Sequence, residues 1–162
     1  MQRIKSILFC AVQLTWGLPQ NLAGGIAYLL LRKKCRQERF HYSLVTYVDT
    51  EGLAGSTLGM FIFLPSARSK SWLHDVRIHE YGHTIQSLLL GPLDLLVTGI
   101  PSMVWASLPA LKRYRDSKQL SYFWFFTESW ANRWGERWAK DRLLNLRLVE
   151  EDIATLPMVV KP

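Results

Sequence analysis

The first pattern along the chain is a long uncharged stretch, residues 6–31, in which apolar side chains dominate and Pro19 stands near the middle. About twenty such residues suffice to cross a bilayer. Because proline interrupts a helix, the stretch could form one kinked spanning helix or two short helices at the membrane surface. Arg3 and Lys5 precede it as in a signal peptide, but no small-x-small cleavage site follows at the right distance. We expect an apolar membrane segment or a helical hairpin here.

The second pattern, residues 40–64, is typical of β-structure. The segments "FHYSLVTYV" and "TLGMFIFL" are rich in β-branched and aromatic residues, and the turn-forming "DTEGLAGS" lies between them. This arrangement predicts a β-hairpin. The apolar part, "LAGSTLGMFIFLP", could instead be a membrane segment, although it is short for one.

Two helices are predicted further along. The first has Ser69 or Ser71 as its N-cap, spans residues 71–90 and ends at Gly91–Pro92. The second starts near Thr127, after the aromatic block "YFWFF", and spans residues 127–148.

The segment between these helices, residues 92–111, is apolar, with Asp94 as its only charged residue. Three prolines and Gly99 interrupt it, which argues against one straight spanning helix. We expect a re-entrant or interfacial segment. At 162 residues the whole chain, 1–162, should form a single domain. Its predicted fold class is mostly α with a small β-hairpin (α+β), with membrane-associated helices around the helix of residues 71–90 and the C-terminal helix.

The charge pattern favours a membrane over a nucleic acid as the partner. The net charge is +7, and the basic residues gather at 32–36 and 112–115, each directly after an uncharged or nearly uncharged stretch. That is the usual place of juxtamembrane charge, and no nucleic-acid recognition motif is present. Seven tryptophans, which prefer membrane interfaces, agree with this interpretation.

The same clusters predict a topology. If both apolar stretches crossed the bilayer, the clusters would lie on opposite sides, against the positive-inside tendency. We therefore expect the stretches to re-emerge, with the basic residues and the helix of residues 71–90 on the cytoplasmic face of an inner membrane. Cys10 and Cys35 are interpreted as reduced thiols, which fits that orientation.

The candidate chemistry is concentrated in "HEYGH", residues 79–83. His79 and His83 are one helical turn apart on the same face, a spacing that suits two imidazoles binding one zinc ion. Glu80 lies about 100° around the helix, where it can take a proton from a zinc-bound water. Gly82 allows another backbone to approach this face.

This stretch resembles the motif of the HExxH zinc metallopeptidases (zincins), and in particular the HExGH variant of membrane-embedded relatives. His79, Glu80 and His83 match that motif directly. The resemblance implies a Zn²⁺ cofactor held by both histidines and Glu80 as the catalytic base. The alternative is a helix whose histidines are merely polar surface residues.

A catalytic zinc site also needs a third protein ligand and an open position for water. Glu128 and Asn132 are one turn apart on the C-terminal helix, and Gly135 and Ala139 continue the same face. This face would allow close helix packing. The arrangement resembles that of the gluzincins, in which a downstream helix supplies the glutamate ligand and an aspartate one turn later orients a histidine. Asn132 stands at the aspartate position here and would orient the imidazole without adding charge.

Other residues compete for roles at this site. Asp94 is an alternative metal ligand, because an isolated carboxylate in an apolar stretch is a functional candidate. His74 lies on a different helical face and is interpreted as a surface residue, and His41 could face a cleft or solvent. Oxyanion stabilisation would need a further donor, for which the sequence offers three tyrosines without choosing between them: Tyr47, Tyr114 and Tyr122.

Two functions remain open at this point. The first is a membrane-associated zinc metallopeptidase that acts on peptides or proteins, with Glu80 as base and His79, His83 and Glu128 as ligands. The second is a non-catalytic integral membrane protein with a structural or sensing zinc site, which would need a fourth protein ligand instead of water. The sequence does not define the oligomeric state.

Overall fold

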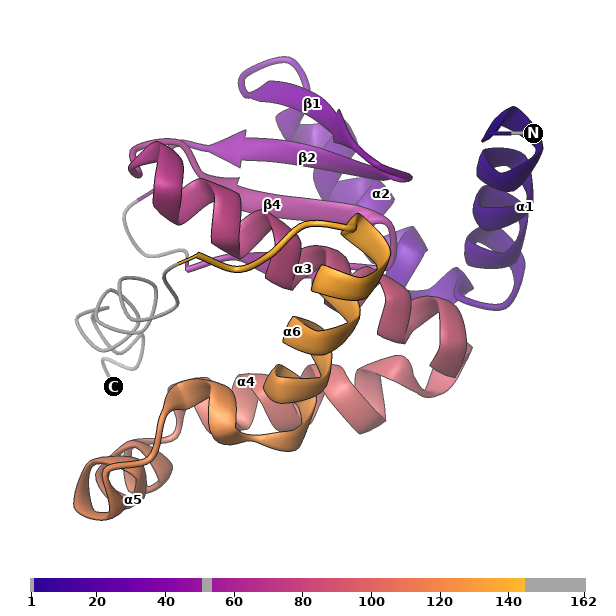
Figure 1. Ribbon diagram of the computed structural model, residues 1–162. Coiled ribbons are helices and arrows are strands. Elements are labelled where there is room, and N and C mark those ends of the chain that lie inside the picture. Colours follow the sequence, from indigo (N-terminus) through magenta and orange to yellow (C-terminus); the bar gives the residue numbers. More distant parts are fainter. Residues whose placement is uncertain (1, 51–53, 145–162) are drawn as a thin grey trace.

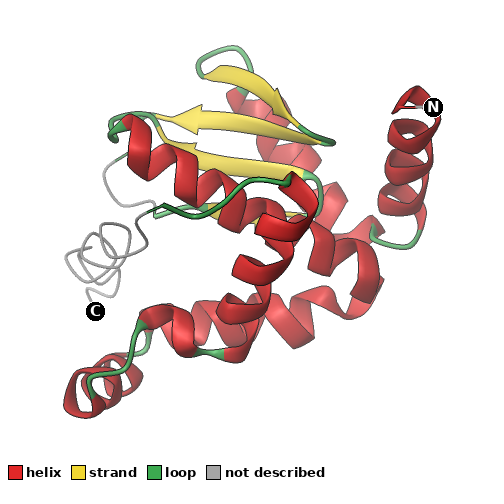
Figure 2. Ribbon diagram, viewed as in Figure 1, coloured by secondary structure: helices red, strands yellow, loops and turns green. Residues whose placement is uncertain are grey.

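The computed structural model describes residues 2–50 and 54–144, and it is mostly helical with one small sheet, as the predicted α+β class requires. Figures 1 and 2 show the sheet on one side of the molecule, with helices on both of its faces and below it. The elements in chain order are α1 (Gln2–Thr15), α2 (Leu18–Leu31), β1 (Arg36–Phe40), β2 (Ser43–Val48), β3 (Ser56–Leu58), β4 (Phe61–Pro65), α3 (Lys70–Leu90), η1 (Gly91–Leu93), η2 (Leu95–Gly99), α4 (Ile100–Ser107), α5 (Pro109–Lys118), η3 (Tyr122–Trp124) and α6 (Phe126–Ala139).

The sheet has the strand order β1-β2-β4-β3, and it corrects the prediction of one hairpin over residues 40–64. The two strand-like segments of that prediction, which contain β2 and β4, pair in parallel, with Val45 opposite Ile62. Antiparallel pairing occurs between β1 and β2 and between β3 and β4. Because β4 is a continuous apolar run that is buried along its whole length, it fits between two strands better than at an edge.

The core lies between the sheet and α3. Alternate residues of β2 and β4, among them Tyr47, Ile62 and Leu64, join a cluster with α3 side chains that include Trp72 and Tyr81. The opposite face of β4 contacts α2, where the ring of Phe61 lies 5.6 Å from that of Tyr28. In Figure 1 α3 runs in front of the strands and α2 behind them. The sheet is therefore covered on both faces, and its edge strand β3 lies beside the middle of α3.

The ends of α3 agree with the predicted helix of residues 71–90. Ser69 is the N-cap, and its hydroxyl accepts a hydrogen bond from the Trp72 amide at 3.2 Å. Gly91 ends the helix with φ +56°, a conformation that favours glycine.

The C-terminal helix is shorter than the predicted 127–148. It ends at Ala139, and Lys140 adopts a left-handed conformation with φ +56°. The chain then returns to α3, where the buried Asp75 carboxylate accepts a hydrogen bond from the Leu144 amide at 2.9 Å. This long-range hydrogen bond replaces further helical turns, although the sequence contains no helix breaker there. Residues 145–148 lie outside the described part of the chain.

The uncharged stretch of residues 6–31 forms two helices, α1 and α2, which are separated at Trp16–Gly17. Within residues 2–50 and 54–144, each helix taken alone falls short of the length and apolar composition needed to cross a bilayer. One bent pair, Lys70–Leu93 with Leu95–Ser107 at 117° to each other, meets both requirements together. The second half of this pair is the apolar segment that was predicted to re-enter or lie at an interface.

The contact between α3 and the segment after α6 should depend on pH. His74 donates to Asp75 at 2.9 Å and to Asp141 at 3.1 Å, and these hydrogen bonds, led by the one to Asp75, raise the pKa of His74. A raised pKa contributes stability that is complete below the unfolded value of about 6.5 and is lost as the pH rises through the folded value. We expect His74→Gln to lower the melting temperature more at about pH 5.5 than at about pH 9.

His41→Gln is the matched control for this measurement. Burial, followed by the nearby Arg77, lowers the pKa of His41, so the wild-type residue disfavours the folded state at low pH. The melting temperature of this variant relative to wild type should therefore rise as the pH falls. If the melting temperatures of both variants, relative to wild type, changed with pH in the same direction, the raised pKa assigned to His74 would be contradicted.

Candidate metal centre

The centre is built where α6 crosses the middle of α3, and two glycines allow the backbones to touch. A Cβ atom on Gly82 would lie 1.9 Å from the carbonyl oxygen of Ala131, and one on Gly135 would lie 2.2 Å from that of Ile78. Such separations are impossible for any residue larger than glycine without a backbone shift. The predicted contact between the histidine face of α3 and the small-residue face of α6 is confirmed, and each glycine fits against the other helix.

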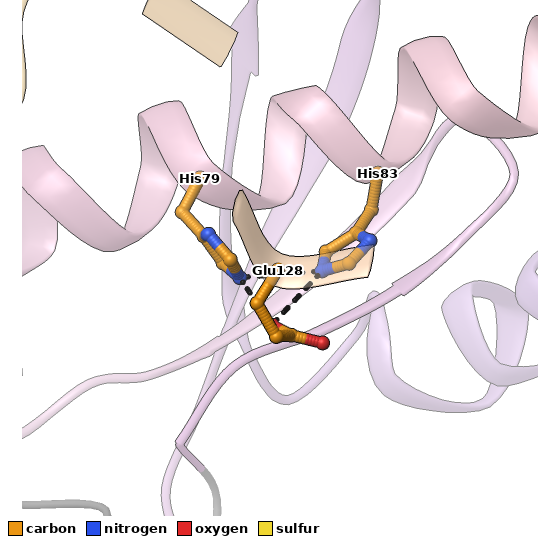
Figure 3. Close-up of side chains that lie close together, drawn as sticks. All are labelled: His79, His83 and Glu128. Carbon is orange, nitrogen blue, oxygen red and sulfur yellow. Dashed lines mark hydrogen bonds and ion pairs between the residues drawn. The ribbon is translucent and has the colours of Figure 1, made fainter. Parts of the chain in front are cut away.

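Three ligand-type side chains meet at this crossing. His79 and His83 project from α3 toward the carboxylate of Glu128 on α6, as Figure 3 shows. Glu128 Oε2 lies 3.2 Å from His79 Nε2 and 3.6 Å from His83 Nε2, and the two nitrogens are 3.2 Å apart. A tetrahedral zinc ion with bonds of about 2.1 Å would place its ligand atoms roughly 3.4 Å apart. The two imidazoles and the carboxylate therefore fit such an ion in donor type and in spacing.

Both imidazoles are oriented by amide oxygens on their far side. His79 Nδ1–H donates to Asn132 Oδ1 at 2.6 Å, and His83 Nδ1–H donates to Gln86 Oε1 at 2.7 Å. The Gln86 amide is itself fixed, because its nitrogen donates to the Thr127 carbonyl at 2.8 Å. In the neutral form with the proton on Nδ1, which a metal ion would require, each imidazole turns its Nε2 lone pair toward the common point. The predicted role of Asn132 as a hydrogen-bond acceptor for one of the histidines is confirmed.

The two carboxylate oxygens of Glu128 have different partners. Oε2 faces the histidines, whereas Oε1 accepts hydrogen bonds from the hydroxyls of Ser102 on α4 and of Thr127, the latter at 3.1 Å. Burial alone would raise the pKa of Glu128, but hydrogen bonds to His79 and His83 and the charges on these residues outweigh it and hold this pKa well below its usual range. The group is thus a buried anion with one oxygen directed at the imidazoles.

His83 carries the complementary charge. Burial by itself would lower the pKa of His83, but the hydrogen bond and negative charge of Glu128 raise it to about 9. A positive metal ion at the same point would satisfy Glu128 in the same way as the protonated imidazole does.

Glu80 lies in a cleft of about 560 Å³ that is also lined by the three ligand-type residues. Its carboxylate Oε2 accepts a hydrogen bond from the Thr57 hydroxyl of β3 at 2.7 Å. Gly55 brings the backbone against the same carboxylate, since a Cβ there would lie 2.4 Å from Glu80 Oε1. The edge strand therefore holds Glu80 in the cleft beside the centre rather than within it.

Of the three tyrosines considered from the sequence, Tyr122 lines the cleft. Burial, together with the nearby Glu128 and Glu80, raises the pKa of Tyr122 well above its usual range. Its phenol donates a hydrogen bond to the Glu128 carboxylate, which is a further cause of this shift. Tyr47 is buried in the core between sheet and helix, and Tyr114 is exposed on α5.

The remaining candidates lie apart from the three converging ligands. Asp94 lines the cleft but accepts a hydrogen bond from the Thr98 hydroxyl at 2.6 Å, and the group of converging ligand atoms consists of His79, His83 and Glu128. His41 stacks on Tyr81 in the turn after β1, with ring centroids 5.1 Å apart. His74, which the sequence indicated as a surface residue, is partly exposed and pairs with two aspartates.

Sequence reasoning did not find Thr57 and Ser102, the hydroxyls that hold the two glutamates. Each belongs to a segment whose position relative to α3 depends on the tertiary fold, and serine and threonine are too common to stand out in a sequence. Comparisons with protein-family models, with curated proteins and with solved structures give no match for this chain.

The glycine contact makes a direct stability prediction. Gly82→Ala should cost roughly 3 kcal/mol in the free energy of unfolding, because the new methyl group collides with the α6 backbone. The matched control is Gly25→Ala in α2, where the Cβ would lie 3.7 Å from the Phe61 ring, in ordinary contact. That change should stabilise by up to about 1 kcal/mol, because alanine favours a helix. Equal effects of the two changes in urea denaturation would contradict the close helix crossing.

Proposed function

We propose that this protein is a zinc-dependent metallopeptidase, with His79, His83 and Glu128 as the zinc ligands and Glu80 as the catalytic base. The observation that carries the proposal is the convergence of two Nε2 atoms and one carboxylate oxygen in the same cleft as a further, separately held carboxylate. Three protein ligands that face a cleft are typical of a catalytic rather than a structural zinc site.

Zinc, when bound, would supply a Lewis acid that lowers the pKa of water and polarises a carbonyl group. Glu80 would accept the proton of the attacking water and return it to the leaving amine, and the hydrogen bond from Thr57 keeps its carboxylate in the cleft. The Tyr122 phenol, which hydrogen-bonds to the Glu128 carboxylate, would help to hold that ligand in place. Asn132 and Gln86 would keep both imidazoles in the tautomer that ligation requires.

The shape of the cleft supports a peptide as the substrate. Residues 56–58 of the edge strand β3 form part of its lining, and an extended peptide can add to such an edge through main-chain hydrogen bonds. Side chains of η2 and α4, including Leu95, Ile100 and Met103, also line the cleft. This lining favours apolar substrate side chains near the bond that is cut.

A non-catalytic zinc site is the second candidate, and the same geometry distinguishes the two. A structural site uses four protein ligands. Within the described residues the converging group has three members, and all of them line a cleft large enough for a substrate. Only the catalytic function requires a carboxylate that is held as Glu80 is.

The ligand assignment predicts which variants lose zinc. Purified wild-type protein should hold one zinc ion per chain by elemental mass spectrometry. His79→Ala, His83→Ala and Glu128→Ala should lose it, because each removes one of three ligands. Asp94→Asn is the matched control and should retain it. Retention in Glu128→Ala together with loss in Asp94→Asn would reassign the third ligand.

The role of Glu80 predicts a different combination of properties. Glu80→Gln should retain full zinc content but lower peptide hydrolysis by about 10²- to 10⁴-fold, because it removes the base and leaves the ligands in place. Hydrolysis of a mixed peptide library, followed by mass spectrometry, measures this. A zinc-loaded wild-type protein that cleaves none of the library, or a Glu80→Gln variant with wild-type rates, would contradict the proposal.

Asn132 should control zinc affinity without being a ligand. Asn132→Leu removes the acceptor for His79 Nδ1–H and should weaken zinc binding about 10- to 100-fold in competition with a chelator. Asn132→Asp keeps the acceptor, adds negative charge and should bind zinc at least as tightly as wild type. Wild-type affinity in the leucine variant would show that the hydrogen bond does not orient the ligand.

A further inference from the structure

The N-terminal helices α1 and α2 bury three amide side chains. Gln13, Gln20 and Asn21 are buried. Gln13 donates to the Thr84 carbonyl at 3.1 Å, and Gln20 donates to the Gly91 carbonyl at 2.8 Å, so the two amides bind α3 and its C-cap residue. A helix of a water-soluble domain normally places its apolar stripe on the core and its polar side chains in solvent.

The outer faces of the same helices are apolar. Ile7 is 69% exposed and Leu30 is 73% exposed, and both belong to a large set of exposed apolar side chains. The other large apolar side chains exposed on α1, α2 and the turn between them are Ile4, Leu8, Leu14, Trp16, Leu18, Leu22, Ile26 and Leu29. An apolar surface of this extent marks an interaction site.

A second apolar surface continues from the end of α3. Residues 89–108 expose Leu89, Leu93, Leu96, Val97, Ile100, Met103, Val104 and Leu108. The two surfaces meet at the junction of α1 and α2, where Trp16 Nε1 donates to the Leu89 carbonyl at 3.4 Å. Gly91 packs against the same indole so closely that a Cβ would lie 2.2 Å from it.

The charges around these surfaces indicate the partner. Residues 6–31 carry no charge, and the only charged residue in 86–111 is Asp94, which is buried. The basic residues 32–34 and 112–113 follow directly at the ends of the two stretches. An apolar surface with a basic border matches a bilayer whose headgroups are anionic. A second copy of this chain would bring basic borders together and is disfavoured.

The helix lengths indicate how deep the chain sits. The 14 residues of α2 span about 21 Å and the 8 residues of α4 about 12 Å, whereas the hydrocarbon core is about 30 Å thick. We propose that the outer faces of α1, α2 and residues 89–108 form one lipid-binding surface that sits in a single leaflet of an anionic bilayer. Because Ile100 and Met103 are exposed on this surface and also line the cleft, the mouth of the cleft lies beside the lipid.

Vesicle flotation tests the surface without requiring catalysis. The full chain should float with vesicles of phosphatidylcholine containing about one third phosphatidylglycerol and should remain bound in about 1 M salt, because apolar burial is not screened. Ile7→Glu and Leu30→Glu should each lower the bound-to-free ratio at least tenfold. Leu144→Glu, at a side chain that is 72% exposed outside this surface, is the matched control and should bind as wild type does. Circular dichroism spectra shared by all variants would show that folding is intact.

Release of wild type by salt, or equal binding of Ile7→Glu and Leu144→Glu, would overturn the proposal. The proposal would also be overturned by a protein that remains unbound and forms a dimer in sedimentation, with Ile7→Glu restoring the monomer.

Labelling with a membrane-impermeant amine reagent then tests how deeply the chain sits in the bilayer. With protein added to preformed vesicles, the exposed Lys33 and Lys118 should both react from outside. Protection of one of them would show that the chain spans the bilayer.

Discussion

The backbones of α3 and α6 touch at Gly82 and Gly135, and the contacts of Glu128 and Asn132 with the histidines depend on this crossing. The distance between the helices decides whether Glu128 reaches both imidazoles and whether Asn132 reaches the far side of His79. A methyl group at either glycine would separate the helices by more than the tolerance of a zinc bond. The two glycines, which touch no ligand atom, are therefore as necessary to the site as the ligands themselves.

The helix α3 contacts three parts of the molecule: the sheet, the candidate centre and the N-terminal helices. The first half of α3 packs its apolar side chains on the sheet, and its middle carries the imidazoles and Glu80. Its C-terminal half offers carbonyl and hydroxyl groups to the buried amides of α1 and α2. A buried anion such as Glu128 is costly unless it is paired, and the two imidazoles and two hydroxyls that surround it provide that pairing. The fold thus buries several polar groups beside its apolar core and leaves many large apolar side chains exposed.

The sequence predicted those features that local chemistry determines. The N-cap Ser69, the stop at Gly91 and the turn spacing of the histidines defined α3, and the small residues after Glu128 indicated the contact face of α6. Features that depend on distant partners were not predictable in this way. The parallel pairing of β2 with β4 follows from covering both faces of β4, and α6 ends early because Asp75 binds the chain beyond it. The hydroxyls of Thr57 and Ser102 reach the glutamates only after the sheet edge and α4 have packed around α3.

An X-ray absorption spectrum at the zinc edge of the purified, zinc-loaded protein tests the central assignment most directly. We expect two imidazole nitrogens at about 2.0–2.1 Å and one or two oxygens at about 2.0–2.2 Å, from Glu128 and an exchangeable water. Addition of a hydroxamate peptide should change the oxygen contribution and leave the imidazoles in place. A sulfur shell at about 2.3 Å, which would implicate Cys10 or Cys35, or a set of four protein ligands that the hydroxamate does not alter, would contradict a catalytic zinc site at the α3–α6 crossing.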